Sequence, residues 1–387
     1  MRICIISAFE DTLLNDTGFS VRIYNLAKSL AALGNTVEIL LPKFRESIVQ
    51  IDGCTAYFLK GFFPERLLKQ IGRLLGVMRP TALFVYDPLF VYKACKIIQK
   101  CDVVQFEQQS AGALLIPIVA KLIKKPIIID CHNIFQALKI KEANFVRKII
   151  ETSIEKMIYK FANLILTVSD KERKVLLSYQ ITKADIAIIP NGVETRIFAP
   201  EKKFESCDYH GLLNKRVVVF VGNMEYAPNK EAVNLIATKI APEVIKKVKE
   251  TIFLLVGRIS GPTYHNLHYL GVVKNVAPIL AASDVAIAPL LNGAGTRLKI
   301  LEYFSCGLPV VSTTVGAEGL EVKNGVHIII EDDMDLFALK IVALLENPKL
   351  SKHIGQSARQ LVLDKYDWTK IGAYLNEVIK KTLIRNQ

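Results

Sequence analysis

The chain has 387 residues, of which 51% are hydrophobic and 22% are charged, and its formal net charge is +13. That length exceeds one compact core and suits two domains of an ordered globular protein. The apolar runs are too short for a transmembrane helix, and the seven scattered cysteines form no CxxC pair, which predicts reduced thiols in the cytoplasm. The charge favours a polyanion or an anionic surface, but without an RNA-recognition motif, zinc finger or arginine-rich tail we expect no nucleic acid.

Short β-branched runs alternate with amphipathic stretches along the chain, a pattern typical of βα units and parallel sheets. The N-terminal run predicts a buried strand, since its apolar stretch is too short for a signal peptide. In the first half the strand candidates are residues 2–7, 36–42, 54–59, 82–86, 102–107, 126–130, 162–169 and 185–190. The pattern restarts in the second half, with candidates at residues 216–223, 251–258, 268–271, 284–289, 309–313 and 326–330.

The stretch between the two series, residues 190–211, is rich in turn formers and charge and is the natural linker. We therefore predict two doubly wound domains, residues 1–193 and 194–365, with a cleft between them. A final helix, residues 366–387, has no strand of its own to cover and is expected to pack back on the first domain. In such sheets ligands bind beyond the carboxyl ends of the strands, so the loops after strands are where function is expected.

A glycine-containing loop leads into a helix within residues 293–302, GAGTRLKILE. The preceding strand is predicted to end at Pro289 and the helix to begin near Thr296. Gly293 and Gly295 let the backbone approach a ligand closely. Because the first amides of a helix are unpaired and favour an anion, this stretch predicts an anion-binding helix start.

Charged side chains extend this motif into the helix. Arg297 and Lys299 add positive charge, and cations together with amides suit a pyrophosphate. Glu302 shares a helix stripe with Lys299 and suits sugar hydroxyls such as a ribose diol. The alternative is an ordinary loop-to-helix connection whose cations face the solvent.

With these residues the sequence resembles the glycosyltransferases of the GT-B fold, specifically the retaining enzymes of glycosyltransferase family four, over nearly its whole length. Glu302 and the following GLPVV match the family's donor motif, Glu-x7-Glu, and Ala294 stands at the usual first glutamate, as in the GAGTRLKILE branch. The resemblance implies two Rossmann-like domains facing a cleft. It also implies transfer of a sugar from a nucleotide sugar, with retention, to an acceptor that is a glycan, a lipid-linked molecule or a small molecule.

The first domain carries two further points of resemblance. TGFSVRIYNLAKSLAALGNTVEIL resembles the family's first loop and helix, in which Gly18 is the equivalent of a glycine that approaches donor or acceptor. IIIDCHNIF resembles the strand end whose histidine, here His132, lies near the donor sugar and positions or polarises the reacting groups. A structural histidine remains the alternative, and Cys131 has no partner ligand nearby in sequence for a metal.

In the second domain, many relatives carry an Arg and a Lys after the first strand, where this chain has Asn223 instead. We infer that Arg297 and Lys299 take over phosphate neutralisation, with Arg258 as a further candidate. The segment that in the family lies over the base would contact it through backbone groups at Gly271 to Val273. The full set expected to bind the donor is Gly18, Asn223, Arg258, Gly271, Val273, Gly293, Gly295, Thr296, Arg297, Lys299 and Glu302, with His132 and Glu302 at the reacting sugar.

Residues 331–335, EDDMD, contain an Asp-x-Asp that binds a metal in the other large glycosyltransferase fold. Here it precedes a helical stretch, where acidic residues cap the helix and complement its dipole. GT-B enzymes generally need no such metal, so we expect no metal and no cofactor besides the nucleotide sugar as co-substrate.

Residues 61–80 mix apolar and basic side chains, which fits either an interfacial membrane helix or an ordinary cationic helix. The expected partners are thus a nucleotide sugar, a glycan or lipid-linked acceptor, and an anionic membrane surface at the inner face. A sugar-nucleotide epimerase or phosphorylase on the same fold, and a catalytically inactive GT-B partner protein, remain open alternatives.

Overall fold

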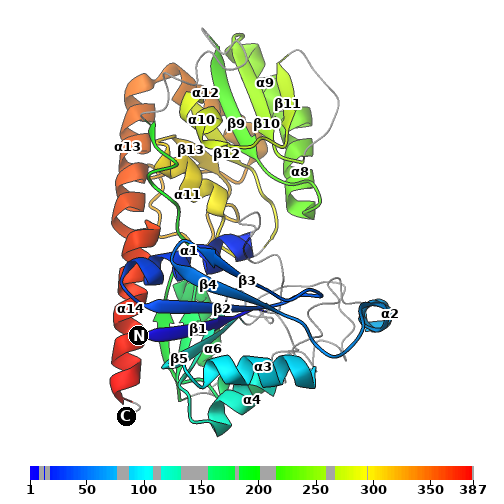
Figure 1. Cartoon of the computed structure of the whole chain (residues 1–387). Helices are drawn as coiled ribbons and strands as arrows, with labels where there is room; N and C mark the ends of the chain where they lie inside the picture. The colour runs from blue at the N-terminus through cyan, green and yellow to red at the C-terminus, as the bar shows by residue number, and fades with distance from the viewer. Residues whose placement is uncertain are drawn as a thin grey trace. The chain divides into compact units, whose positions relative to one another are not determined.

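The computed structural model describes residues 1–7, 13, 18–75, 87–107, 115–131, 156–178, 183–200, 215–258, 266–293 and 295–385. The chain divides into two compact units. Unit 1 is Met1–Pro190 with Trp368–Gln387, and unit 2 is Asn191–Asp367. Each unit is built on its own, mostly parallel sheet with helices on both faces (Figure 1). None of the described helices is long and apolar enough to cross a membrane.

The sheet of unit 1 has eight strands in the order β3-β4-β2-β1-β5-β6-β7-β8. The strands are β1 Arg2–Ile6, β2 Thr36–Pro42, β3 Ser47–Ile51, β4 Cys54–Leu59, β5 Val103–Glu107, β6 Ile127–Cys131, β7 Leu164–Thr167 and β8 Asp185–Ile188. All neighbouring pairs are parallel except β3 and β4. The carboxyl ends of the parallel strands therefore share one edge.

Helices cover both faces of this sheet because successive side chains of a strand point to opposite faces. Ile3 and Ile5 belong to a core shared with α1 and α14, and Cys4 and Ile6 belong to a core shared with α2, α3, α4 and α6. The helices are α1 Gly18–Ala32, α2 Glu65–Leu75, α3 Pro88–Ile98, α4 Leu115–Leu122, α6 Asp170–Ser178 and α14 Trp368–Arg385.

The C-terminal helix α14 lies against α1 within unit 1. The Ser29 hydroxyl donates a hydrogen bond to the backbone oxygen of Trp368 at 3.1 Å. The Asn35 side-chain amide donates to Asn376 Oδ1 at 3.0 Å, and both asparagines are buried. The last helix thus supplies part of the cover of the first sheet (Figure 1).

Most predicted strands of the first half are present, but β3 was not predicted. Its residues are mostly exposed, so the apolar runs used to find strands pass over it. It forms an antiparallel hairpin with β4 through Asp52 and Gly53, whose φ values of 46° and 79° are those of a tight two-residue turn. The predicted strand at 82–86 lies outside the described residues.

Unit 2 has six parallel strands in the order β11-β10-β9-β12-β13-β14. They are β9 Arg216–Val221, β10 Thr251–Val256, β11 Leu267–Gly271, β12 Val285–Ala288, β13 Val310–Ser312 and β14 Ile329–Ile330. The helices are α8 Ala227–Leu235, the π-helical turn η5 Ile236–Ile240, α9 Ala241–Lys247, α10 Ala277–Ala282, α11 Leu298–Ser305, α12 Met334–Glu346 and α13 Pro348–Lys365. The strand order is that of a dinucleotide-binding sheet, 3-2-1-4-5-6.

Two apolar cores lie on either side of this second sheet. Val217 and Val219 of β9 pack with α10, α11 and α13, whereas Val218 and Phe220 pack with α8, η5, α9 and α12. The sheet is covered on both faces, as near-continuous apolar strands require. The prediction of two doubly wound α/β sheets is confirmed.

The Asp-x-Asp of residues 331–335 caps a helix, as predicted. Asp333 is the N-cap of α12, and its Oδ1 accepts hydrogen bonds from the backbone N–H groups of Asp335 at 2.9 Å and Leu336 at 3.0 Å. These bonds satisfy two of the unpaired amides at the start of the helix.

Candidate functional site

The site in unit 2 is set by the point at which β9 and β12 separate. The two strands pair only at Val218 with Val285 and at Val219 with Ala286. Beyond these pairs β9 leads to α8 on one face of the sheet and β12 leads to α11 on the other. Ligands of doubly wound sheets bind at such a switch point, beyond the carboxyl ends of the strands.

A tyrosine fills the gap that opens between the two strands. The backbone N–H of Val221, the last residue of β9, donates to the Tyr303 hydroxyl at 2.8 Å. Tyr303 is fully buried in α11, and burial raises the pKa of its hydroxyl far above the ordinary value. The phenol therefore stays neutral and replaces the ladder hydrogen bond that β12 no longer provides.

A lysine and an asparagine join the two helices that flank the switch point. Lys299, in the first turn of α11, donates from Nζ to Oδ1 of Asn229 in α8 at 2.9 Å. The same ammonium lies 4.2 Å from the centroid of the Phe220 ring, at the end of β9. The cation is thus fixed beside the end of β9 by one neutral acceptor and one aromatic face.

Arg297 lies next to this lysine, at the N-cap of α11, and is 7% exposed. A Cβ on Gly293 would lie 2.7 Å from Arg297 Nη2 and 2.7 Å from the Tyr226 hydroxyl. Gly293, with φ 122°, therefore leaves room for two side chains of the protein itself. The helix begins at Leu298, two residues later than the sequence predicted.

The pKa values in the site are set by burial and by three neighbouring charges, those of Arg297, Lys299 and Glu302. Burial, and then the charge of Arg297, lower the pKa of the Lys299 ammonium to about 7, against a smaller opposing effect of Glu302. Burial raises the pKa of the Glu302 carboxyl to about 7, against the opposing effect of Lys299. Both groups are poised to change charge near neutrality, which is common at functional sites.

A buried hydroxyl completes this side of the site. Thr296 Oγ1 lies 3.0 Å from the position of a Cβ on Gly319, in the loop that follows β13. Among the described residues this oxygen has no hydrogen-bond partner. A bound ligand is one group that can satisfy it.

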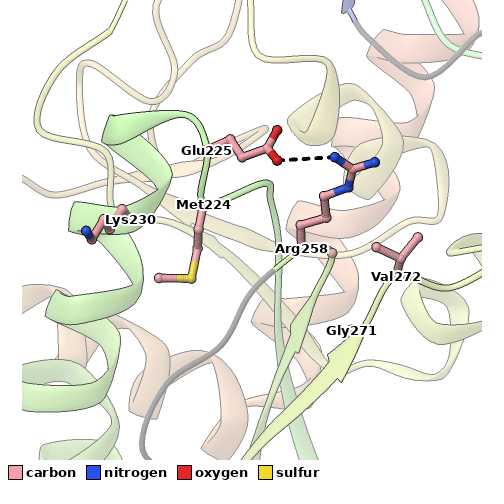
Figure 2. Close-up of a pocket in the computed structure, with 7 residues that line it drawn as sticks. Met224, Glu225, Lys230, Arg258, Gly271 and Val272 are labelled. Carbon is pink, nitrogen blue, oxygen red and sulfur yellow. Dashed lines mark hydrogen bonds and ion pairs between the residues drawn. The ribbon is translucent and has the colours of Figure 1, made fainter.

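A pocket of about 640 Å³ lies along the same edge of the sheet, beyond β9, β10 and β11 (Figure 2). Its lining residues are Met224, Glu225, Lys230, Gly257, Arg258, Gly271 and Val272. Arg258 Nη1 and Glu225 Oε1 form an ion pair at 3.2 Å, and both side chains are exposed. Hydrogen bonds from Asn223 and Arg258 lower the pKa of the Glu225 carboxyl, so this carboxylate stays charged.

Asn223 connects the pocket to the lysine. Its Nδ2 donates to Glu225 Oε2 at 3.2 Å, and its backbone oxygen accepts from Asn229 Nδ2 at 3.0 Å. A continuous chain of polar contacts therefore runs from the pocket through Asn223 and Asn229 to Lys299.

The structure places the predicted donor residues of unit 2 in two groups. One group follows β12 and consists of Gly293, Gly295, Thr296, Arg297, Lys299 and Glu302. The other lies at or just beyond the ends of β9, β10 and β11 and consists of Asn223, Arg258, Gly271 and Val273. Arg258 pairs with Glu225, so its charge is already partly balanced. Sequence reasoning gave no role to Tyr226, Asn229 or Tyr303, whose contributions appear only in contacts between distant segments.

Of the predicted residues in unit 1, Gly18 is the first residue of α1, and His132 lies outside the described residues, as does Ala294 of unit 2. Within the described ranges, no group of three or more His, Cys, Asp or Glu side chains is arranged to hold a metal ion.

A buried ion pair stands at the end of β6, one residue before Cys131. Arg22 of α1 donates to both carboxylate oxygens of Asp130, at 2.9 Å and 2.7 Å, and both side chains are fully buried. Arg22 Nη1 also donates to the backbone oxygens of Ile189 and Pro190, at 2.8 Å and 3.2 Å. One guanidinium thus ties α1, β6 and the last residues of unit 1 together.

Comparison with known proteins matches both halves of the chain to glycosyltransferase families. Residues 17–197 match the family model described as Glycosyltransferase Family 4, and residues 215–347 match the one described as Glycosyl transferases group 1. A curated relative is the GDP-mannose-dependent alpha-(1-6)-phosphatidylinositol monomannoside mannosyltransferase of Mycolicibacterium smegmatis, 26% identical, over 78% of this chain and 83% of the relative.

Solved structures agree on the fold. The sucrose-phosphate synthase of Thermosynechococcus elongatus superposes with a TM-score of 0.70 at 17% identity, covering 100% of both chains. The Anabaena protein HepE, solved in complex with UDP and glucose, superposes with a TM-score of 0.67 at 15% identity, over 98% of this chain and 99% of HepE. The architecture is that of the GT-B glycosyltransferases. The chain therefore belongs to the glycosyltransferases, with a first half of Glycosyltransferase Family 4 and a second half of Glycosyl transferases group 1.

Proposed function

We propose that unit 2 binds the nucleotide sugar, with the diphosphate beside Lys299 and Arg297 at the switch point. The observation that carries this proposal is the Lys299–Asn229 contact, which holds a cation where β9 and β12 separate. A diphosphate is an anion of the size and charge that two neighbouring cations and the first amides of α11 favour. The nucleoside would occupy the adjacent pocket, bounded by Arg258 and Val272.

The nucleotides named for two similar proteins support this assignment. One is named as dependent on GDP-mannose, and HepE was solved with UDP and glucose. We therefore propose a nucleoside diphosphate sugar as donor, with UDP and GDP as the two nucleotides to test first.

In the proposed reaction the protein positions the sugar and stabilises the departing diphosphate. Lys299 and Arg297 would neutralise the charge that develops on the diphosphate oxygen as the bond to the sugar breaks. Glu302 would orient hydroxyl groups of the ribose or the sugar, and His132 of unit 1 would act at the sugar. These cations supply the positive charge that a metal provides in other transferases, so we propose that no resident metal takes part. Retention of anomeric configuration is proposed by family resemblance.

For the acceptor we propose a glycolipid or another lipid-linked glycan, bound by unit 1. The mannosyltransferase relative is named for a phosphatidylinositol monomannoside. A surface suited to lipid lies at the start of α2, where Phe62 is 75% exposed and Leu67 is 38% exposed beside the exposed basic residues Arg66 and Lys69. Apolar and basic side chains together favour the interface of an anionic membrane.

The test is acceptor-dependent release of nucleoside diphosphate. The protein is incubated with UDP-glucose or GDP-mannose, with and without a phosphatidylinositol monomannoside acceptor, and the configuration of any product is read by NMR. Release that depends on the acceptor, with a product of the donor's configuration, is expected for at least one donor. Interconversion of the donor without acceptor would instead identify an epimerase.

A further inference from the structure

Asn229 makes two hydrogen bonds that together fix the orientation of its side-chain amide. Nδ2 donates to the backbone oxygen of Asn223 at 3.0 Å, and Oδ1 accepts from the Lys299 ammonium at 2.9 Å. A backbone carbonyl only accepts and an ammonium only donates, so the reverse orientation of the amide would break both bonds.

We propose that Asn229 is a positioning residue for the transfer reaction, which holds the Lys299 ammonium at the β9–β12 switch point for the diphosphate of the donor. The inference rests on the proposed donor site and adds to it a residue from α8, the helix after β9. The cation itself comes from α11, the helix after β12.

The side chain that holds Lys299 is neutral, and this matters for an anion site. Among the described residues, the Lys299 ammonium donates its one hydrogen bond to Asn229, and its other close neighbour is the Phe220 ring. A carboxylate at position 229 would form an ion pair and compete with a phosphate for the cation. The amide oxygen of Asn229 orients the Lys299 ammonium without neutralising its charge, which can then attract a phosphate.

The Asn229 side chain is buried beside Gly222. It is 7% exposed, and its Cγ would lie 3.0 Å from a Cβ on Gly222, so the amide occupies the space that a larger residue there would need. Because the amide is buried and also bonded to Asn223, the position of Lys299 is set before a ligand arrives. Preorganisation of this kind is what a site for developing charge requires.

The charged groups that act on Lys299 come from its own helix and that helix's N-cap. They are Arg297 and Glu302, whereas the side chains that contact Lys299 from α8 and β9 are the neutral Asn229 and Phe220. A substitution at position 229 therefore changes the neutral side chain that accepts the hydrogen bond of Lys299 and leaves Arg297 and Glu302 as they are.

The experiment uses Asn229→Asp and Asn229→Ala in the full chain. Both variants lose the Nδ2–H donor to Asn223, and they differ in what stands beside Lys299, a carboxylate in Asn229→Asp and a methyl group in Asn229→Ala. Binding of UDP and of GDP is measured by calorimetry from about pH 6 to about pH 9, a range that spans the titration of Lys299. The control is Asn234→Asp, the same substitution on an exposed part of α8.

We expect both variants to bind the nucleotide that the wild type binds about tenfold or more weakly, with the control unchanged. The pH at which affinity declines should move upward in Asn229→Asp, because a carboxylate keeps Lys299 protonated. It should move downward in Asn229→Ala, because the acceptor is lost. Thermal denaturation of each variant confirms that it is folded.

Opposite shifts of the pH profile are not produced by a merely structural role. Wild-type affinity and an unshifted profile in both variants would overturn this inference while leaving the donor site intact. An equal loss of affinity with an unchanged profile would also overturn it. Absence of binding of both UDP and GDP by the wild-type protein would overturn the proposed donor site and this inference with it.

Discussion

The backbone N–H of Val221 donates to the hydroxyl of Tyr303, 2.8 Å away, at the place where β9 loses its pairing with β12. A side chain from α11 thus completes a hydrogen bond of the sheet and keeps the two strand ends apart. Lys299 lies one turn earlier in the same helix. The hydrogen bond of Tyr303 to β9 therefore also fixes α11, the helix that carries the Lys299 ammonium.

Replacement of Tyr303 by phenylalanine should leave the part-buried Val221 N–H without its acceptor. We expect the free energy of unfolding to fall by about 1 kcal/mol, the lower end of the cost of an unsatisfied buried donor. Chemical denaturation measures the change. Tyr374→Phe is the control, since that tyrosine is 51% exposed, and its effect should be within about 0.5 kcal/mol. Equal stability of Tyr303→Phe and wild type would contradict the role given to the hydroxyl.

Lys299 and Glu302 should lower the stability of the unliganded protein near neutral pH. Glu302 holds its proton in the folded state up to about pH 7, whereas the unfolded side chain loses it near 4.5, so stability falls as pH rises between these values. Lys299 loses its proton in the folded state at about 7 and in the unfolded state near 10.5, so stability falls as pH drops between those values.

Lys299→Met and Glu302→Gln should therefore each be more stable than wild type near pH 7, on the order of 1 kcal/mol, with the full shift discounted for partial exposure. Denaturation curves at several pH values measure this. The gain of Glu302→Gln should disappear at acid pH, below the ordinary pKa of a glutamate, and that of Lys299→Met at strongly alkaline pH. A loss of stability in both variants at neutral pH would contradict the burial argument.

The Arg22–Asp130 pair should be essential to unit 1 because both side chains are fully buried. Arg22→Met removes the guanidinium that faces the buried Asp130 carboxylate, and we expect a loss of about 3–5 kcal/mol of stability. The double variant Arg22→Met/Asp130→Leu should recover part of that loss, since no unpaired charge remains. Lys246→Ala breaks the exposed pair with Glu243 and should change stability by less than about 1 kcal/mol. Additive losses in the double variant would argue against the ion-pair explanation.

The membrane proposal predicts that the protein floats with vesicles containing anionic lipid at low salt. Phe62→Ser and Leu67→Ser together should reduce the bound fraction several-fold, because they remove the exposed apolar groups next to the basic residues of α2. Leu336→Ser, at an exposed leucine of unit 2, is the matched control. Wild-type protein that stays unbound at low salt would exclude this surface as a membrane contact.

Strands buried on both faces were predictable because their apolar runs are nearly continuous, as in β9 and β10. The edge strand β3 was missed because it is exposed and therefore lacks such a run. The Asp52-Gly53 dipeptide was the available signal, since it favours a tight hairpin turn.

The chemistry of the donor motif was predictable from Arg297, Lys299 and Glu302, which lie close together in sequence. The contact that positions Lys299 was not predictable, because Asn229 is 70 positions away in sequence. The Arg22–Asp130 pair of unit 1 was not predictable for the same reason, since its members are 108 positions apart. Such contacts depend on the order of strands in the sheet, which one sequence does not specify. The depressed pKa of Lys299 likewise follows from burial that is created only when α11 packs against β9.

The central claim is that Lys299 and Arg297 bind the diphosphate of the donor. Calorimetric titration of UDP and of GDP into the wild-type protein, Arg297→Ala, Lys299→Ala and the exposed control Lys340→Ala tests it most directly. We predict binding of at least one nucleotide by the wild type and the control, and a loss of affinity of about tenfold to a hundredfold in each site variant. Unchanged affinity in both site variants would contradict the account.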